Sequence, residues 1–253
     1  MYRYFEFPLS EKLIHFNHAA VGPWPKRTSE AVKKFAEENA EFGSLRYADW
    51  LKKELLLRRQ LQQLLNAPSA NDIALVKNTS EALSFVAYGL DWNKGDNIVS
   101  SDEEFPSNRI PWQSLENQGV EFRQVDLNSC DSPEDALFSL VDNKTRLITI
   151  SSIQFATGLR VDLDLIGRFC KERGILFCVD AIQSLGGVRF DVQSCQADFV
   201  MADGHKWMLG PEGLGVFYTK PEAREKLKLT QYGWHMIKNT HSYENRPWEI
   251  HPT

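Results

Sequence analysis

The chain has few cysteines and no long apolar run, and both absences limit what it can be. Its four cysteines, Cys130, Cys170, Cys178 and Cys195, form no CxxC pair and no zinc-type spacing. No apolar stretch reaches membrane-spanning length, and the N-terminus is too charged for a secretory signal peptide. We therefore expect a reduced, cytoplasmic protein with no metal site and no membrane segment, in which Cys170 and Cys178 are buried thiols.

The chain also lacks a block of basic residues. Its 29 Lys and Arg are outnumbered by 34 Asp and Glu, which gives a net charge of −5 and a pI near 5.7. A nucleic-acid binder needs clustered cations against the phosphate backbone, so no nucleic-acid partner is expected. Two phosphate-binding signatures are absent as well: the GxxxxGK[ST] of a P-loop and the GxGxxG of a Rossmann dehydrogenase.

What the chain does contain, from residue 72 onward, is an alternation of short apolar runs with helical segments. The runs predict strands at 73–76, 97–100, 120–125, 146–151, 175–179, 199–202 and 215–218, and the segments predict helices near 80–90, 107–118, 133–141, 162–173 and 221–228. This pattern predicts an α/β fold, a three-layer α/β/α sandwich with a seven-stranded, mostly parallel sheet. Only a short loop separates the last two strands, so the last strand should be antiparallel.

Three parts of the chain are expected. Residues 1–25 are irregular, and residues 26–228 form a large domain that begins with a helical segment at 26–66. In that segment Thr28 or Ser29 caps the first helix, and a second helix covers 48–66. Residues 229–253 form an aromatic tail with two of the seven Trp and three of the six His. The tail has no clear periodicity, so it should be disordered or packed against a surface that the chain does not supply.

Polar side chains follow several of the predicted strands. Lys206 follows the strand at 199–202, Asp180 ends the strand at 175–179, and Thr79 and Ser80 open a helix after the first strand. The carboxyl ends of parallel strands gather at one edge of the sheet, where such folds bind ligands. Taken singly, each residue has an ordinary structural alternative; Thr79 or Ser80, for example, is a suitable helix cap.

Taken together, these groups match pyridoxal phosphate (PLP) better than any single alternative. Thr79 with Ser80 offers an anion site, Phe105 a flat stacking surface, Asp180 a carboxylate, Gln183 an amide and Lys206 an amine. A lysine forms a Schiff base with the PLP aldehyde, and a carboxylate keeps the pyridine nitrogen protonated so that the ring accepts electrons. The sequence therefore predicts a PLP enzyme that acts on an amino acid.

Five segments resemble the class V aminotransferase superfamily of fold type I PLP enzymes, which includes cysteine desulfurases, selenocysteine lyases and isopenicillin N epimerase-like proteins. They are FNHAAVGP, NTSEA, EEFPSNRIPW, VDAIQSLG and ADGHKWMLGPEGLG. The resemblance extends from about Asn17 to the C-terminus. It implies the large domain of the PLP-dependent transferase fold and a homodimer with its active sites at the subunit interface. It also implies a C-terminal small domain, with a substrate-binding Arg and a persulfide-forming Cys, which we expect to be missing after Thr253.

The resemblance also assigns roles to individual residues. It implies that Lys206 carries the Schiff base, that Asp180 bonds the pyridine nitrogen and that Gln183 bonds the 3-oxygen of the ring. It implies a phosphate site made by Thr79, Ser80 and His205. Gln154 and Asp203 are further expected cofactor contacts, and Asn17 and Ala20 are expected substrate contacts.

Two positions depart from the desulfurase pattern. Phe105 stands where desulfurases commonly stack a His on the ring, and Phe cannot transfer protons, which favours an epimerase-like or lyase-like reaction. Asp203 stands where desulfurases often have a phosphate-binding Ser, so its carboxylate should point elsewhere or its backbone should make the contact. Two alternatives stay open: a PLP-binding fragment that is catalytically incomplete, and an α/β nucleotide-binding protein without PLP.

Overall fold

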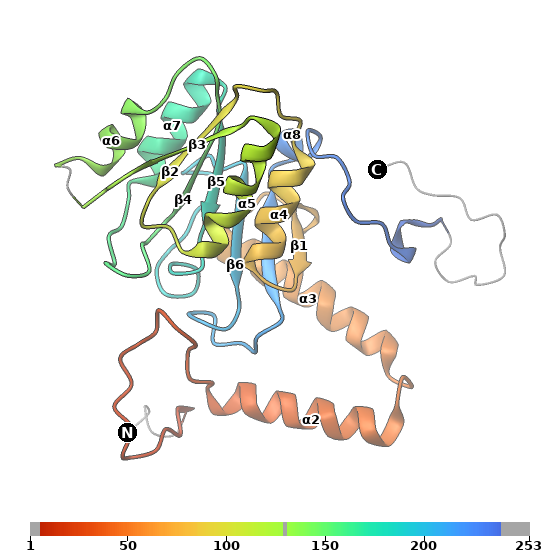
Figure 1. The fold of residues 1–253 in the computed structure, drawn as a ribbon. Coiled ribbons are helices and arrows are strands. Elements are labelled where there is room, and N and C mark those ends of the chain that lie inside the picture. Colours follow the sequence, from red (N-terminus) through yellow and green to blue (C-terminus); the bar gives the residue numbers. More distant parts are fainter. Residues whose placement is uncertain (1–5, 129–130, 239–253) are drawn as a thin grey trace.

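A computed structural model describes residues 6–128 and 131–238, which fold around a seven-stranded sheet (Figure 1). The strand order is β1-β7-β6-β5-β4-β2-β3. The strands are β1 (Ile73–Val76), β2 (Asn97–Ser101), β3 (Glu121–Val125), β4 (Thr145–Ser151), β5 (Leu176–Asp180), β6 (Phe199–Asp203) and β7 (Gly215–Thr219). Strand β7 is antiparallel to both of its neighbours, and the other pairs are parallel. The prediction of an antiparallel last strand is therefore confirmed.

Helices cover both faces of the sheet. One core packs α3 (Tyr47–Leu65), α6 (Pro133–Ser139) and α7 (Leu163–Arg173) against one face. A second core packs α4 (Thr79–Gly89), α5 (Ile110–Gln113) and α8 (Pro221–Arg224) against the other. Because both faces are covered, strands β2, β5, β6 and β7 are buried at every position, which explains their continuous apolar runs. The predicted three-layer architecture is confirmed.

Three details of the predicted helices are wrong. Helix α2 (Lys26–Phe42) begins after Pro25 and is not capped by Thr28 or Ser29; the hydroxyl of Thr28 donates instead to the carbonyl oxygen of Leu209, 3.3 Å away. The segment at 107–118 is not one helix, because the 3₁₀ turns Pro106–Asn108 and Ser114–Gln118 flank the short α5. Pro111 supplies no N–H within this segment, which disfavours a continuous helix. Helix α8 ends at Arg224, short of the predicted 228.

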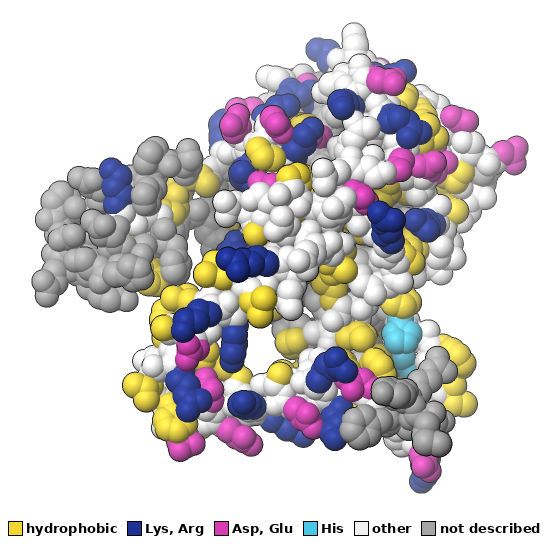
Figure 2. Space-filling view, turned by 180° about the vertical axis from the view of Figure 1, so that it is seen from behind, with side chains coloured by type: hydrophobic (Ala, Val, Ile, Leu, Met, Phe, Trp, Pro, Cys, Tyr) yellow, Lys and Arg dark blue, Asp and Glu magenta, His cyan; other side chains and the backbone are white. Residues whose placement is uncertain are grey.

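Helix α2 lies apart from the sheet, to which α3 connects it (Figure 1). None of its 17 described residues is buried. Its larger apolar side chains, Val32, Phe35 and Phe42, are all exposed. Viewed from behind, the part of the surface that contains α2 carries mixed hydrophobic and charged side chains (Figure 2).

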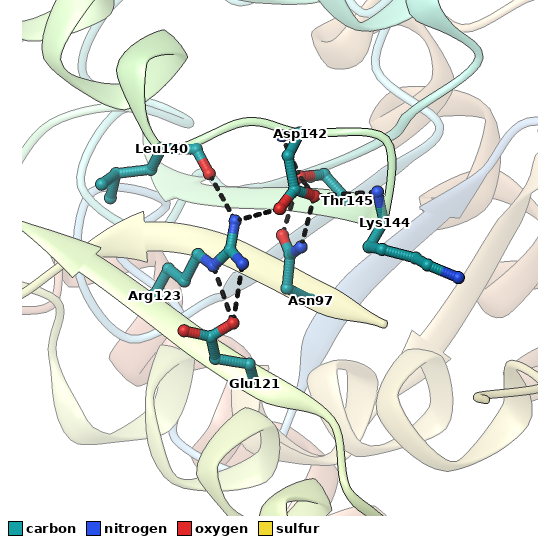
Figure 3. A network of polar contacts seen from close by, with 7 residues as sticks. All are labelled: Asn97, Glu121, Arg123, Leu140, Asp142, Lys144 and Thr145. Carbon is teal, nitrogen blue, oxygen red and sulfur yellow. Dashed lines mark hydrogen bonds and ion pairs between the residues drawn. The ribbon is translucent and has the colours of Figure 1, made fainter. Parts of the chain in front are cut away.

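The amino-terminal ends of β2, β3 and β4 are tied together by a polar network (Figure 3). The guanidinium of Arg123 binds Glu121 at 2.7 Å and Asp142 at 2.8 Å, and Asp142 also accepts from Asn97 Nδ2 at 2.8 Å. The backbone N–H of Lys144, followed by the Arg123 and Asn97 hydrogen bonds, lowers the pKa of Asp142 to about 2. This network holds the sheet at the edge opposite the strand ends that carry the predicted site.

The predictions for the cysteines and for the C-terminal tail concern residues that the structure describes only in part. Cys170 and Cys178 are buried, as predicted, and so is Cys195, whereas Cys130 lies outside the described residues. Of the tail predicted at 229–253, residues 239–253 also lie outside the described part, and a 3₁₀ turn forms at Trp234–Met236. No helix in the described ranges has both the length and the apolarity to cross a membrane.

Candidate functional site

The carboxyl ends of β1, β2, β4, β5 and β6 lie at one edge of the sheet because these strands run in the same direction. The loops after them carry the predicted site residues, and contacts between loops bring these residues together. Ser80 Oγ donates to Ser107 Oγ at 2.9 Å, Gln154 Nε2 to Glu104 at 2.9 Å, and Trp207 Nε1 to Gln183 Oε1 at 3.0 Å.

Lys206 is buried in the loop after β6, with only 7% of its surface exposed. Loss of solvent lowers the pKa of its ammonium group, and the nearby carboxylates of Asp180 and Asp203 oppose that shift. Its Nζ lies 5.5 Å from the centroid of the Phe105 ring. A buried lysine with a lowered pKa is a better nucleophile than an exposed one, because more of it is the neutral amine.

Asp180 ends β5 and is 2% exposed. Burial raises the pKa of its carboxyl to about 7; the Glu104 charge adds to this rise, and the Ile182 N–H and the Lys206 charge oppose it. Its Oδ1 accepts the Ile182 N–H at 3.0 Å. A cationic group placed beside this carboxyl would favour its ionised form.

Glu104 is a buried part of this site that the sequence did not single out. Its carboxylate accepts four hydrogen bonds, from Ser151 N and Ser151 Oγ at 2.6 Å each, Asn108 Nδ2 at 2.8 Å and Gln154 Nε2 at 2.9 Å. Burial raises its pKa, and these hydrogen bonds oppose the rise. In the sequence Glu104 is the last of three consecutive acidic residues, and the pattern gives no sign of which one is buried.

The two glutamines of the site have fixed orientations. Trp207 Nε1 can only donate, so its bond to Gln183 Oε1 leaves the Gln183 amide nitrogen as the donor, and one of its hydrogens goes to Ala19 O at 2.9 Å. Gln154 is 1% exposed and donates through Nε2 to Glu104. Its Oε1 is buried without a hydrogen-bond partner among the described residues.

The residues predicted to bind a phosphate lie where α4 begins. Asn78 Oδ1 accepts from Glu81 N at 2.9 Å and caps the helix, so the alternative in which Thr79 or Ser80 is the cap is wrong. Thr79 is buried, and its Oγ1 has no hydrogen-bond partner in the described part of the chain. Free backbone N–H groups and a free hydroxyl at the start of an 11-residue helix favour a bound anion.

The side chain of Asp203 points into its own loop. Its Oδ1 accepts the N–H of Gly204 at 2.8 Å. His205 Nδ1 lies 3.1 Å from the same oxygen, but at an angle that makes no hydrogen bond, so this buried nitrogen stays unpartnered within the described ranges. The structure thus directs the Asp203 carboxylate toward His205 and the loop backbone.

Residues 17–28, which we call the N-terminal strap, lie along the Lys206 loop. Gly22 N donates to His205 O at 2.8 Å, and Trp24 Nε1 donates to Gly210 O at 3.1 Å. A Cβ atom on Gly22 would lie 2.4 Å from the carbonyl oxygen of Lys206, so the close approach requires glycine at this position.

Within the strap, the predicted substrate contacts lie beside the Gln183–Trp207 pair. Asn17 Oδ1 accepts from Ala20 N at 3.3 Å, which makes a local turn. The His18 ring stacks on Trp207 with centroids 5.1 Å apart. The strap therefore brings Asn17 and Ala20 to the same edge as the strand-end residues.

Two further polar features lie outside this constellation. A cavity of about 610 Å³ is bordered by Ser152 and Ser184, and Lys206 is not among its lining residues. Asp102, Glu103 and Asp126 hold carboxylate oxygens within 4.8 Å of one another on the surface. Exposed acidic groups of this kind are common without a bound cation.

Comparison with known proteins gives a family match over most of the chain. The model of the family described as aminotransferase class-V matches residues 14–253. A probable cysteine desulfurase from Methanothermobacter thermautotrophicus is 36% identical over 237 residues, which cover 90% of this chain and 58% of that protein. A probable cysteine desulfurase from Pyrococcus abyssi is 32% identical over 228 residues, which cover 86% and 56%.

Two solved structures also superpose on this chain. The cysteine desulfurase CsdA from Escherichia coli superposes with a TM-score of 0.84 at 26% identity, covering 99% of this chain and 64% of that one. The cystine C–S lyase C-DES, solved with its product cysteine persulfide, has a TM-score of 0.84 at 26% identity and covers 92% and 64%. The chain thus spans less than two thirds of the length of these proteins.

Proposed function

We propose that this chain, which belongs to the aminotransferase class-V family, holds the cofactor site of a PLP-dependent enzyme that acts on an amino acid. The family uses PLP. The observation that carries the proposal is the burial of Lys206 beside Asp180, under the face of Phe105. Because the chain spans only 58% and 56% of two relatives, the activity and substrate of the whole protein are part of the proposal.

The residues present fit PLP group by group. The unpartnered hydroxyl of Thr79, with Ser80 beside it, suits the phosphate. The fixed donor nitrogen of Gln183 suits the 3-oxygen of the ring, and the exposed face of Phe105 suits the ring itself. When bound, the cofactor supplies an aldehyde that condenses with amines and a ring that accepts electrons from the bonds at Cα.

Lys206 has two roles in this proposal. Its neutral amine, favoured by burial, is the nucleophile that holds the aldehyde carbon of the cofactor. With an amino acid bound beside it, the Lys206 amine would be the group that moves a proton at the substrate Cα. The strap closes one side of this loop through Gly22 and limits the access of water.

Asp180 holds the proton on the pyridine nitrogen. Its carboxyl has a pKa raised to about 7 by burial in the protein alone. A pyridinium N–H beside it would lower that pKa again, so that carboxylate and cation stabilise each other. The pair is what lets the ring withdraw electrons from Cα.

The relatives point to a sulfur-containing amino acid as substrate. Two are named as probable cysteine desulfurases, and a structural neighbour is a cystine C–S lyase. Phe105 offers no proton to the site, so proton transfer falls to Lys206. We therefore propose cleavage at the Cβ–S bond, or epimerisation at Cα. A reaction that needs a second acid at position 105 is disfavoured.

A homodimer and a cytoplasmic location are further parts of the proposal. The dimer is supported by the exposed apolar residues of α2, none of which the described chain buries. Sedimentation velocity on the purified protein tests it, and a monomer at high concentration would count against it. A PLP-binding protein without complete catalytic machinery remains the second candidate, and turnover of cysteine by the PLP-loaded chain separates the two.

Borohydride reduction tests the central assignment. The chain mixed with PLP should turn yellow, and reduction followed by peptide mass mapping should place the label on Lys206. Lys206→Ala should lose the label while retaining weaker, non-covalent PLP binding. Lys144→Ala, in the polar network at the amino-terminal ends of β2, β3 and β4 (Figure 3), should label like the wild type. A label that persists in Lys206→Ala would refute the lysine assignment, and a wild-type chain that does not bind PLP would favour the nucleotide-binding alternative.

A further inference from the structure

A chain of hydrogen bonds runs from the second core to the candidate site, and it begins at Trp112. The Trp112 indole is fully buried, and its Nε1 donates to Asn108 Oδ1 at 3.0 Å. An indole N–H can only donate, so it fixes which end of the Asn108 amide is oxygen. Asn108 Nδ2 consequently faces Glu104 as a donor, at 2.8 Å.

Both carboxylate oxygens of Glu104 accept hydrogen bonds. Oε2 takes the Asn108 Nδ2 hydrogen, and Oε1 takes the backbone N–H of Ser151 at 2.6 Å. A proton on either oxygen would face one of these donors. Burial raises the pKa of Glu104, and the hydrogen bonds from these donors oppose that rise.

Glu104 in turn orients Gln154. Glu104 Oε1, which accepts the Ser151 N–H, also accepts from Gln154 Nε2 at 2.9 Å. Gln154 Oε1 is then left buried without a hydrogen-bond partner in the described part of the chain. An unpaired buried amide oxygen is costly, so the site is complete only when a donor reaches it.

Gln154 is adjacent in the chain to a residue that packs in the Lys206 region. The next residue, Phe155, packs edge-on against Phe105 with ring centroids 5.2 Å apart. Lys206 Nζ lies 5.5 Å from the same Phe105 ring. The site thus contains two amides of opposite polarity: Gln183 is held as a donor by Trp207, and Gln154 is held as an acceptor by Glu104.

We propose that Glu104 is a positioning residue that holds Gln154 Oε1 as the hydrogen-bond acceptor for an N–H or O–H group of the bound ligand. The inference rests on the proposed function, since the ligand is then PLP or the amino acid that joins it. Both carry suitable donors, PLP on its ring and the amino acid on its amine.

A double-mutant cycle tests the proposal. Gln154→Leu removes the acceptor, and Glu104→Gln removes the acceptor-only group that orients it. Each variant should weaken ligand binding about tenfold, the change expected for one lost hydrogen bond. The double variant should bind no more weakly than Gln154→Leu alone, because Glu104 then has nothing left to orient. Losses that multiply to about 100-fold would overturn the proposal.

Two titrations identify the source of the donor. The first measures the Kd of PLP for the cofactor-free chain, and the second measures the Kd of cysteine for the PLP-loaded chain from the change in absorbance. If PLP carries the donor, the tenfold loss of affinity should appear in the Kd of PLP. If the amino acid carries it, the loss should appear in the Kd of cysteine. No loss in either titration would overturn the proposal.

Ser151→Ala is the matched control, because it removes one hydroxyl donor to Glu104 and leaves the Ser151 N–H bond in place. It should lower the melting temperature without changing ligand affinity or the absorbance maximum of the bound cofactor. Glu104→Gln and Gln154→Leu should both shift that maximum. If Glu104→Gln does not fold, Trp112→Phe releases Asn108 instead, and its loss of affinity should likewise vanish in the Gln154→Leu background.

The outcomes separate this inference from the proposed function. A wild-type chain that does not bind PLP overturns both. A wild-type chain that binds PLP, combined with unchanged binding in Glu104→Gln, overturns the role of Glu104 alone.

Discussion

Replacing Asp180 by Asn tests the electrostatics of the site without any cofactor. The Asp180 side chain is 2% exposed, and burial raises its pKa to about 7. In the unfolded chain the same carboxyl titrates near 3.9. Between these two pH values the native state keeps a proton that the unfolded state has lost, so the free energy of unfolding falls as the pH rises. Asn keeps the shape and the Ile182 hydrogen bond but carries no charge.

The size of the effect follows from the shift. A rise from 3.8 to about 7 is worth roughly 4 kcal/mol at 1.36 kcal/mol per pH unit. Near pH 4.5 the difference should be only about 1 kcal/mol, because that pH lies little more than half a unit above the pKa of the carboxyl in the unfolded chain. At pH 8 the variant should be more stable by roughly 2 to 4 kcal/mol.

Urea unfolding of the cofactor-free chain, followed by circular dichroism under reducing conditions from pH 4.5 to 8, measures this difference. The other titratable groups are present in both proteins, so the difference between the two curves reports on Asp180 and its charge interactions with Glu104 and Lys206. A difference that does not change with pH would refute the reasoning. Adding PLP at pH 8 should stabilise the wild type more than the variant, because only the wild type gains a carboxylate–pyridinium pair.

Two further predictions concern the anion site and the strap. Thr79→Val removes an unpartnered hydroxyl, so the stability of the cofactor-free chain should not fall. PLP should bind the variant at least tenfold more weakly in a fluorescence titration. Equal PLP affinity would show that Thr79 does not contact the phosphate. Gly22→Ala should displace the strap and speed its cleavage in limited proteolysis, because the new Cβ would lie 2.4 Å from Lys206 O. Gly233→Ala is the control, since its Cβ would enter open space, and equal cleavage of the two variants would contradict the contact.

The fold could be predicted because it depends on local patterns. Strands buried on both faces give continuous apolar runs such as 199–202, and those runs predicted all seven strands. The short loop before β7 was enough to set its direction. The same approach failed at 107–118, where the apolar pattern was helical but Pro111 and the flanking 3₁₀ turns break the helix.

The candidate site could be predicted only in part, because much of it depends on contacts between distant segments. Asp180 and Lys206 end or follow strands, and strand ends of this kind are visible in a sequence. Glu104 is distinguished from its acidic neighbours only by Ser151 and Gln154, which are 47 and 50 residues away. The orientation of Gln183 depends on Trp207 and on Ala19, which is 164 residues away. No local pattern contains that information.

The N-terminal strap has a consequence for the order in which the protein is made. Trp24 is synthesised early, and its partner Gly210 lies 186 residues further along the chain. At about 5 to 20 residues per second, a ribosome needs roughly 10 to 40 s to add that length. Throughout that interval the strap has no surface to bind, and its Val21 and Trp24 side chains stay available to chaperones. The strap can therefore cover the Lys206 loop only after Gly210 has been synthesised.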